Sequence, residues 1–286
     1  METPRALNLT KPSEVRAFLR DMGFQPSRIL GQNFLIDRNI LDILLDQAHL
    51  TPHDRVLEVG PGLGVVTQAL CDRSAHVVAI EKDRRLAAHL RTTLAHRPNL
   101  TLIEADATSL DLPQLLTHHS LTKFVANLPY SVGTRVLVDC LHAPARPTRI
   151  VITLQREVAD RIVAPPGTPD FGLLSLWSQL DYTPRLHKVV ANTCFYPPPQ
   201  IQSAIVVFEP TPRNLPLLNE PLFRQLAKHA FSGRRKQIQA LLRTFPPSAG
   251  RELPLLQAAA IPPEARPEII PLEAWSRLAN AIASPA

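Results

Sequence analysis

Short apolar runs rich in β-branched residues alternate with amphipathic helical patterns over residues 55–154, and this alternation restricts the possible folds more than any other feature. The runs VVAI at 77–80 and IVIT at 150–153 lack the every-second-residue pattern of a half-exposed strand. They are therefore expected to be strands buried on both faces. Strands that alternate with helices form a parallel sheet with right-handed crossovers. The sequence thus predicts an α/β fold with a doubly wound, mostly parallel sheet.

The pattern along the chain predicts three parts. Strands are expected at 55–59, 76–81, 100–104, 123–127 and 149–154, with helices at 63–72, 83–95 and 132–142 between them. Before these elements, helices are expected at 13–22 and from Asp37. After them, helices are expected at 156–163 and 173–180 and strands at 185–190 and 204–208. A proline-rich break at Glu209–Pro216 leads into four expected helices, at 220–231, 233–245, 254–260 and 271–283. We therefore expect an N-terminal helical extension over 1–25, an α/β domain over 26–209 and a smaller all-helical domain over 210–286.

Positive charge is concentrated in the last quarter of the chain. The formal net charge is +6, and residues 210–286 hold 10 Lys and Arg against 5 Asp and Glu. Arg234, Arg235 and Lys236 stand together on an expected helix. Arginine presents a planar fork that suits phosphate and stacks on bases, so this region is expected to bind RNA. A general arginine bias on a solvated surface is the alternative that composition alone leaves open.

Cysteine usage and hydropathy predict a cytoplasmic protein without metal. Cys71, Cys140 and Cys194 are far apart and form no CxxC pair, which is typical of free thiols in a reducing compartment rather than of a zinc site or a disulfide framework. No apolar run approaches the roughly 18 residues that a membrane-spanning helix needs. The N-terminus also lacks the basic-then-apolar layout of a signal peptide.

A glycine loop follows the first strand of the alternating region. Gly60, Gly62 and Gly64 stand in GPGLG after a Glu-Val strand end, and Glu81 ends the next strand. Glycines allow a ligand to approach the backbone closely, and an acid about 20 residues later can accept the ribose hydroxyls of an adenosine cofactor. A dinucleotide prefers GxGxxG, whereas Val65 stands at the sixth position here. The GxGxG spacing favours S-adenosylmethionine, and Asp106 is placed to accept from the adenine amine.

Asn127, Leu128, Pro129 and Tyr130 close the fourth strand, at the edge where open α/β sheets bind ligands. An adenine exocyclic amine is a poor nucleophile, because its lone pair is delocalised into the ring. The Asn127 side-chain oxygen and the carbonyl of Leu128 or Pro129 can each accept one amine hydrogen, which aims the lone pair at a methyl group. Proline holds the backbone, and Tyr130 offers a face for stacking. The NLPY segment therefore predicts methyl transfer to an adenine amine by positioning.

The chain resembles the small-subunit ribosomal RNA adenine N6 dimethyltransferases, which are related to the erythromycin-resistance rRNA methyltransferases, over about residues 15–283. The pieces that carry the resemblance are LGQNFL at 30–35, the GPGLG loop, Glu81, Asp106-Ala107, NLPY at 127–130, LQREV at 154–158, FGLLS at 171–175, FYPPP at 195–199, Ser203-Ala204 and FSGRRK at 231–236. The family usually has Lys and Asp where this chain has Gln200 and Gln202.

The resemblance implies a Rossmann-like methyltransferase that binds S-adenosylmethionine. By resemblance the cofactor site comprises Gln32, Asn33, Leu35, Gly60, Gly62, Glu81, Lys82, Asp106, Ala107 and Asn127. It also implies that Phe195 and Tyr130 sandwich a flipped adenine, a stacking worth about 1–3 kcal/mol per aromatic face.

The resemblance further implies that the enzyme dimethylates N6 of two adjacent adenosines in the 3′-terminal hairpin of small-subunit rRNA. The expected partner is that rRNA within a pre-30S particle, and the expected state is a monomer. Three alternatives stay open: an enzyme that acts on a large-subunit rRNA adenine, a non-catalytic assembly factor with the same fold, and a nicotinamide oxidoreductase.

Overall fold

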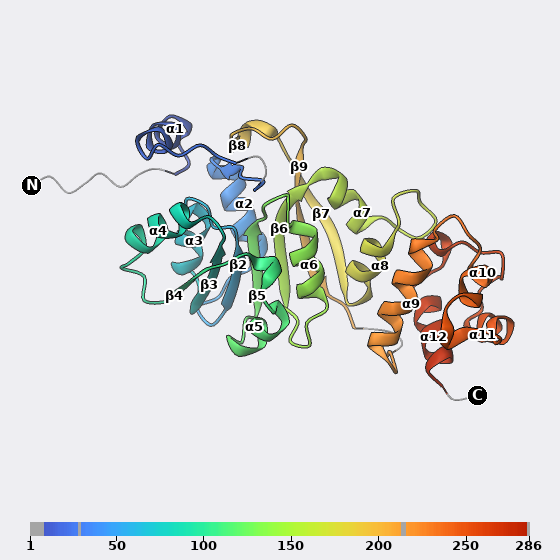
Figure 1. Ribbon diagram of the computed structural model, residues 1–286. Coiled ribbons are helices and arrows are strands. Elements are labelled where there is room, and N and C mark those ends of the chain that lie inside the picture. The colour runs from blue at the N-terminus through green and yellow to red at the C-terminus, as the bar shows by residue number, and fades with distance from the viewer. Residues whose placement is uncertain (1–8, 28–29, 213–215, 285–286) are drawn as a thin grey trace, which may run out of the picture. The chain divides into compact units, whose positions relative to one another are not determined.

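The structure is a computed structural model that describes residues 9–27, 30–212 and 216–284. The chain forms two compact units (Figure 1). The first unit runs to Ala159 and resumes over Arg185–Glu209, and the second comprises Asp160–Pro184 and the chain from Pro210 onward. Among the described residues, no helix has both the length and the apolar character that crossing a bilayer requires.

A seven-stranded sheet with the order β4-β3-β2-β5-β6-β9-β7 organises the first unit. Neighbouring strands from β4 to β6 run parallel, and β9 pairs antiparallel with β6. The strands are β2 Arg55–Val59, β3 His76–Glu81, β4 Leu100–Glu104, β5 Lys123–Asn127, β6 Arg149–Gln155, β7 Tyr182–Val190 and β9 Ser203–Pro210. Strand order reverses between β2 and β5, so the carboxyl ends of these two strands flank the position where open α/β sheets bind ligands. The predicted mostly parallel Rossmann-like sheet is confirmed.

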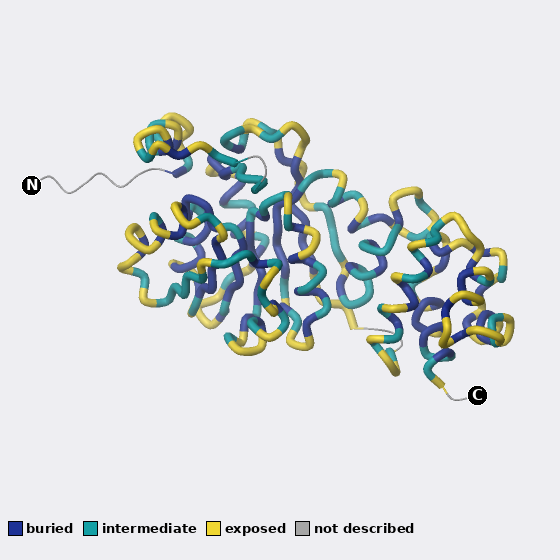
Figure 2. The backbone as a smooth tube through the Cα atoms, viewed as in Figure 1, coloured by how far each residue is buried: buried dark blue, intermediate teal, exposed yellow. Residues whose placement is uncertain are grey.

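Helices pack on the sheet through the apolar stripes that the sequence shows. Leu44 of α2 and Leu70 of α3 belong to one buried cluster with Val125 and Val151 of the sheet, and α6 covers the other face (Figure 1). The central strands β2, β3, β5, β6 and β9 are mostly buried, whereas the edge strands β4 and β7 are largely intermediate or exposed (Figure 2). The helices that lie wholly or partly in this unit are α1 Pro12–Asp21, α2 Arg38–Ala48, α3 Val65–Cys71, α4 Arg84–Thr93, α5 Leu112–His118, α6 Gly133–Leu141 and α7 Arg156–Val163.

Two very short strands form a separate antiparallel sheet that the sequence did not predict. In it β1, Phe34–Leu35, pairs with β8, Phe195–Tyr196. Phe34 lies opposite Tyr196 and Leu35 opposite Phe195. Two residues are too few to show a period of two, so no strand pattern was visible. The pairing joins the LGQNFL segment to the FYPPP segment, although about 160 residues separate them.

The second unit is all-helical apart from the start of β7. Its helices are the end of α7, then α8 Leu173–Leu180, α9 Glu220–Ser232, α10 Ile238–Arg243, α11 Glu252–Ala259 and α12 Leu272–Ala283. Phe171, Leu176, Phe223 and Trp275 share its buried core. The sequence predicted a boundary at 210, but residues 160–184 group with the tail instead, because the apolar side chains around α8 pack into the helical core.

Removing the Leu44 side chain tests the packing of α2 on the sheet. Leu44 is fully buried, so Leu44→Ala is expected to lower the free energy of unfolding by about 2–5 kcal/mol. Ile201→Ala, at a side chain that is 41% exposed in the same unit, should cost less than about 0.5 kcal/mol. Urea denaturation followed by circular dichroism measures both. Equal losses in the two variants would contradict this packing.

Candidate active site

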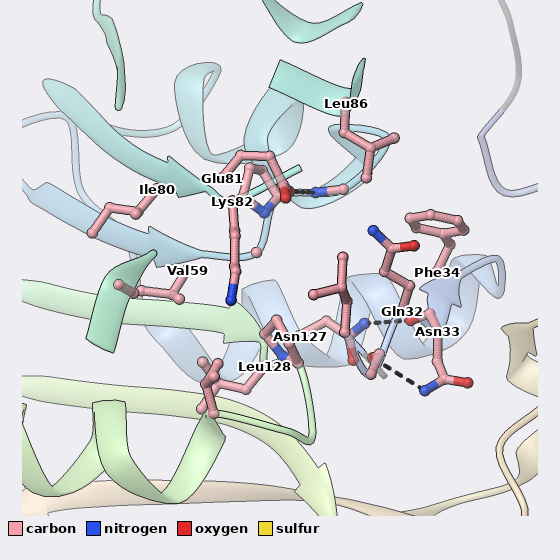
Figure 3. A pocket seen from close by; sticks show the side chains of 18 of the residues that line it. Gln32, Asn33, Phe34, Val59, Ile80, Glu81, Lys82, Leu86, Asn127 and Leu128 are labelled. Atoms are coloured by element: carbon pink, nitrogen blue, oxygen red, sulfur yellow. Dashed lines mark hydrogen bonds between the residues drawn. The ribbon is translucent and has the colours of Figure 1, made fainter. Parts of the chain in front are cut away.

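A cavity opens at the carboxyl ends of the parallel strands of the first unit (Figure 3). Six chain segments line it: Leu9, the stretch 30–35 that contains β1, and the stretches at the carboxyl ends of β2, β3, β4 and β5. Its lining includes Gln32, Asn33, Leu35, Gly60, Gly62, Glu81, Lys82, Asp106, Ala107, Asn127, Leu128 and Pro129. Every residue predicted for the cofactor site is in this lining, so the structure brings together segments that lie up to 97 residues apart.

Two glycines allow the loops to approach one another. At Gly60, where φ is +73°, a Cβ would lie 2.4 Å from Cγ of Pro129. At Gly31, where φ is +66°, a Cβ would lie 2.9 Å from the Tyr130 backbone nitrogen. Both positions combine a left-handed backbone with contact against the NLPY segment, so only glycine is accommodated without strain. The glycine loop and the LGQNFL segment therefore hold NLPY from two sides.

Glu81 places a buried carboxylate at the end of β3. Its two oxygens accept hydrogen bonds from the backbone nitrogens of Gly62, at 3.0 Å, and Asp83, at 2.8 Å. Burial raises the pKa of Glu81, and the two backbone donors oppose that rise. These bonds fix the carboxylate at the rim of the cavity, and its remaining lone pairs can accept hydroxyl hydrogens from a ligand.

Asp106 and Lys82 form an ion pair on the same rim. Lys82 Nζ lies 2.7 Å from Asp106 Oδ2, while Asp106 Oδ1 accepts from the Thr108 backbone nitrogen at 2.9 Å. The bonds from Lys82 and Thr108 lower the pKa of Asp106 to about 2. Asp106 is thus an anion over the whole physiological range, and its Oδ2 keeps a lone pair for a further donor.

The Asn127 carboxamide is held in one orientation. Its Nδ2 donates to the backbone carbonyl of Asn33 at 3.0 Å, and a carbonyl can only accept. The amide nitrogen must therefore face Asn33, which leaves Oδ1 as the group presented to a ligand. No sequence pattern predicts this bond, because the partner is a main-chain atom 94 residues away.

The side chains of the LGQNFL segment mainly hold the segment itself. Gln32 accepts from the Ser27 backbone nitrogen at 2.7 Å and donates to Asp83 at 3.1 Å. The Asn33 amide donates to the carbonyl of Gly31 at 3.2 Å. Gln32 and Asn33 thus line the cavity as predicted, but their amides are engaged within the protein. Gln32 and Asn33 therefore contribute mainly their shape and main-chain groups to the cavity, rather than free side-chain amides.

The hydrogen bonds of the NLPY backbone show which of its two candidate carbonyl acceptors, Leu128 or Pro129, is available to a ligand. The Pro129 carbonyl accepts from Val132 and Gly133 at 3.2 and 2.9 Å, at the start of α6. The Leu128 nitrogen donates to the Thr153 carbonyl at 3.1 Å. In the described part of the chain, no hydrogen bond is formed to the Leu128 carbonyl. Leu128 therefore supplies the available main-chain acceptor, a choice that the sequence left open.

Tyr130 lies beside the cavity and outside its lining. The residue is half-buried, and its phenol forms a hydrogen bond with the hydroxyl of Ser203 at the start of β9. Burial raises the pKa of Tyr130, and the bond to Ser203 acts in the opposite direction. The phenol is therefore neutral and anchored. Ser203 belongs to a segment that carries the family resemblance, but no sequence pattern predicts its contact with Tyr130.

Phe195 does not take the position expected of it. Its side chain is 2% exposed and belongs to the core cluster that contains Leu35 and Leu44. Alternation along β8 explains this placement, because Phe195 and Tyr196 must point to opposite sides. Tyr196 packs on the cluster of the N-terminal helix, and the Arg16 guanidinium lies 5.9 Å from its ring centroid. In this structure the expected sandwich of Phe195 and Tyr130 is not formed.

The basic cluster of the second unit lies in a turn and not on the expected helix. Arg234, Arg235 and Lys236 connect α9 to α10. Arg234 donates to the carbonyl of Pro169 and lies 3.9 Å from Glu268, while Arg235 and Lys236 are exposed. The turn arises because α9 ends at Ser232, so the expected helix begins only at Ile238.

Glu58 is a second buried acid and lies near the end of β2, two residues before the first glycine of the loop. It is 1% exposed, and burial raises its pKa to about 8, with a further rise from the Glu81 carboxylate and an opposing effect of the Thr67 hydroxyl. Glu58 is thus neutral at pH 7 and adds no charge beside Glu81. No group of three or more His, Cys, Asp or Glu side chains able to hold a metal occurs within the ranges the structure describes.

The strand order, the glycine loop and the acids after β3 and β4 define the Rossmann-like fold of the class I methyltransferases. A model of the family described as ribosomal RNA adenine dimethylase matches residues 23–284. The chain belongs to this family.

Two curated relatives are similar over nearly their whole length. The ribosomal RNA small subunit methyltransferase A of Opitutus terrae is 41% identical over 271 residues, which cover 93% of this chain and 97% of the relative. The protein of the same name from Geobacter metallireducens is 36% identical over 269 residues, which cover 92% and 98%.

Solved structures show the same architecture. The 23S rRNA methyltransferase ErmE superposes with a TM-score of 0.63 at 28% identity, over 88% of this chain and 100% of that one. A dimethyladenosine transferase from Plasmodium falciparum superposes with a TM-score of 0.70 at 21% identity, over 85% and 94%, which supports the fold alone.

Gly60→Ala tests the close approach of the glycine loop to NLPY. Gly23 also has a left-handed backbone, with φ of +60°, but nothing lies within 4 Å of its Cβ position. Both alanine variants carry a backbone cost of about 1 kcal/mol, and the clash with Pro129 should make Gly60→Ala about 1–3 kcal/mol less stable than Gly23→Ala. Urea denaturation measures the difference. Equal stability of the two variants would show that the loops are not in contact.

Glu58→Gln tests the neutral state of the buried acid. Between the pKa of an unfolded Glu, near 4.5, and about 8, the folded state binds the proton more tightly. Wild-type stability should therefore fall as the pH rises through this window, by up to about 1.4 kcal/mol per unit, and the variant should lack this fall. Melting temperatures of both proteins from about pH 5 to about pH 8 are the measurement. A constant difference across the range would contradict the raised pKa.

Proposed function

We propose that this protein transfers methyl groups from S-adenosylmethionine to N6 of two adjacent adenosines in the 3′-terminal hairpin of small-subunit rRNA, as a monomer that acts on a pre-30S particle. Its family and the names of its relatives support the substrate class. The observation that carries the proposed chemistry is the oriented carboxamide of Asn127, bonded through Nδ2 to the Asn33 carbonyl.

The cavity suits S-adenosylmethionine better than a nicotinamide dinucleotide. Ile80, Ala107 and Leu128 offer apolar contacts for an adenine ring, Glu81 offers acceptors for ribose hydroxyls, and Asp106 offers one for the adenine amine. The spacing GxGxG also departs from the GxGxxG of dinucleotide sites, and the one Lys or Arg of the described lining, Lys82, is paired by Asp106. The acidic rim instead favours a ligand with positive charge.

The reaction needs the target nitrogen to be aimed rather than deprotonated beforehand. When bound, S-adenosylmethionine supplies a methyl group on a positively charged sulfur. Asn127 Oδ1 and the Leu128 carbonyl can each accept one hydrogen of the adenine N6, because Nδ2 and the Pro129 carbonyl are committed elsewhere. Two acceptors at this place turn the nitrogen lone pair out of conjugation with the ring and toward the cavity. Positioning of this kind supplies most of the rate in such a transfer.

The arrangement is compatible with two successive transfers to one nitrogen. After the first methyl, N6 keeps one hydrogen, and the base must present it again to an acceptor. A neutral carboxamide accommodates the bulkier amine without leaving a buried charge unpaired. The half-buried ring of Tyr130 offers a face on which the base can stack.

The second unit is proposed to hold RNA backbone. The surplus of cations in residues 210–286 supports this role, and Arg235 and Lys236 are exposed in the turn after α9. Arg234 is proposed to stabilise that turn rather than to contact RNA, since it donates a hydrogen bond to the Pro169 carbonyl. Phosphate contacts of this kind weaken as salt rises.

A large-subunit rRNA adenine is the second candidate substrate, and the similarity to ErmE favours testing it. Primer extension on both rRNAs, after incubation of purified subunits with protein and methyl donor, distinguishes the two. Stops confined to the 3′ hairpin of the small-subunit rRNA support the proposal, stops in the large-subunit rRNA support the second candidate, and no methylation at all supports an assembly factor.

Asn127→Ala tests the role of the carboxamide. Loss of Oδ1 should reduce turnover on small subunits by about 100-fold or more, because the amine is no longer held, while the affinity for S-adenosylmethionine should fall less than about tenfold. Radiolabelled methyl transfer and calorimetric titration measure the two quantities, and the melting temperature checks folding. Wild-type turnover in this variant would remove Asn127 from the mechanism.

A further inference from the structure

The hydrogen bond between Tyr130 and Ser203 joins the end of one strand to the start of a strand that is not its neighbour. Tyr130 follows β5, and Ser203 begins β9. Strand β6 lies between them in the sheet, where Gln155 is the register partner of Ser203. Ser203 is fully buried, and its hydroxyl reaches across to the phenol. The pairing of the strands does not require this side-chain bond, because β6 separates β5 from β9 in the sheet.

We propose that Ser203 is a positioning residue that fixes the direction of the Tyr130 ring for the target adenine, an inference that rests on the proposed function. The phenol oxygen lies on the long axis of the ring, so a bond to it fixes where that axis points. The backbone of Tyr130 is held at the other end, against Gly31. With both ends of the side chain fixed, the long axis of the ring is held, so the ring cannot move away from the base that Asn127 is proposed to hold.

The site needs this constraint because, among the residues that the structure describes, no aromatic ring pairs with Tyr130. Phe195 is buried in the core, and Tyr196 packs on the N-terminal helix cluster. A lone ring that stacks a flipped base must therefore be oriented by its own contacts. The hydroxyl of Ser131, the nearest alternative in sequence, donates to the Leu30 carbonyl at 3.1 Å, which leaves Ser203 as the anchor.

The bond also links the ring to an exposed segment of the chain, which we take to contact RNA. Ser203 directly follows the stretch 197–202, in which Pro198, Gln200, Ile201 and Gln202 are exposed. If RNA displaces this stretch, we expect Ser203 to move with it and to shift the Tyr130 phenol through their hydrogen bond. Loss of the hydroxyl should therefore affect the use of RNA and leave the cofactor cavity, which Ser203 does not line, unchanged.

Ser203→Ala and Ser203→Thr provide the test, with Tyr130→Phe as the reciprocal variant. Ser203→Ala should lower kcat/KM on small subunits by about tenfold, equivalent to about 1.4 kcal/mol, with an unchanged dissociation constant for S-adenosylmethionine. Ser203→Thr keeps the hydroxyl and should restore most of the activity. Tyr130→Phe should match Ser203→Ala, and the double variant should lose no more than either alone, because both remove one bond.

Ser178→Ala is the matched control, since Ser178 is fully buried in the second unit and its hydroxyl has no hydrogen-bond partner among the described residues. It should keep the wild-type kcat/KM. Wild-type kcat/KM in Ser203→Ala, additive losses in the double variant, or an equal loss of cofactor affinity would each overturn the inference. Absence of rRNA methylation by the wild-type protein would instead overturn the proposed function, and this inference with it.

Discussion

The hydrogen bond from the Asn127 amide to the Asn33 carbonyl is the interaction on which the proposed site depends. It leaves the oxygen of Asn127 as the atom presented to a ligand, and it can form only where the LGQNFL segment meets the end of β5. That meeting in turn requires a glycine at position 31, because a Cβ there would lie 2.9 Å from the Tyr130 nitrogen. The small β1–β8 sheet holds the same segment from its other end. The orientation of one carboxamide is therefore set by contacts spread over most of the first unit.

Electrostatics around the cavity are consistent with a positively charged ligand. Glu81 is buried yet supported by two backbone donors, and Asp106 stays ionised because Lys82 and Thr108 lower its pKa. Glu58, which has no comparable donors, has a pKa raised to about 8 by burial. Glu58 and Asp106 thus have different protonation states at pH 7, and the difference follows from their burial and their hydrogen-bond partners.

The sequence was sufficient for the features that have a period or a motif. Strands β2 to β5 have the predicted bounds, and the glycine loop, Glu81 and Asn127 meet at one edge as the parallel order requires. The sequence did not predict contacts that involve main-chain atoms or very short strands. The β1–β8 pairing, the Asn33 carbonyl and the burial of Phe195 depend on tertiary register, and the grouping of α8 with the tail depends on packing between distant segments.

A crystal structure of the protein with S-adenosylhomocysteine and an RNA hairpin that carries the two adenosines tests the proposed binding of the target base most directly. We expect the N6 of an extruded adenine within hydrogen-bond distance of Asn127 Oδ1 and of the Leu128 carbonyl, with Nδ2 still on the Asn33 carbonyl. An adenine held elsewhere, or an Asn127 amide turned so that its nitrogen faces the base, would contradict this mechanism.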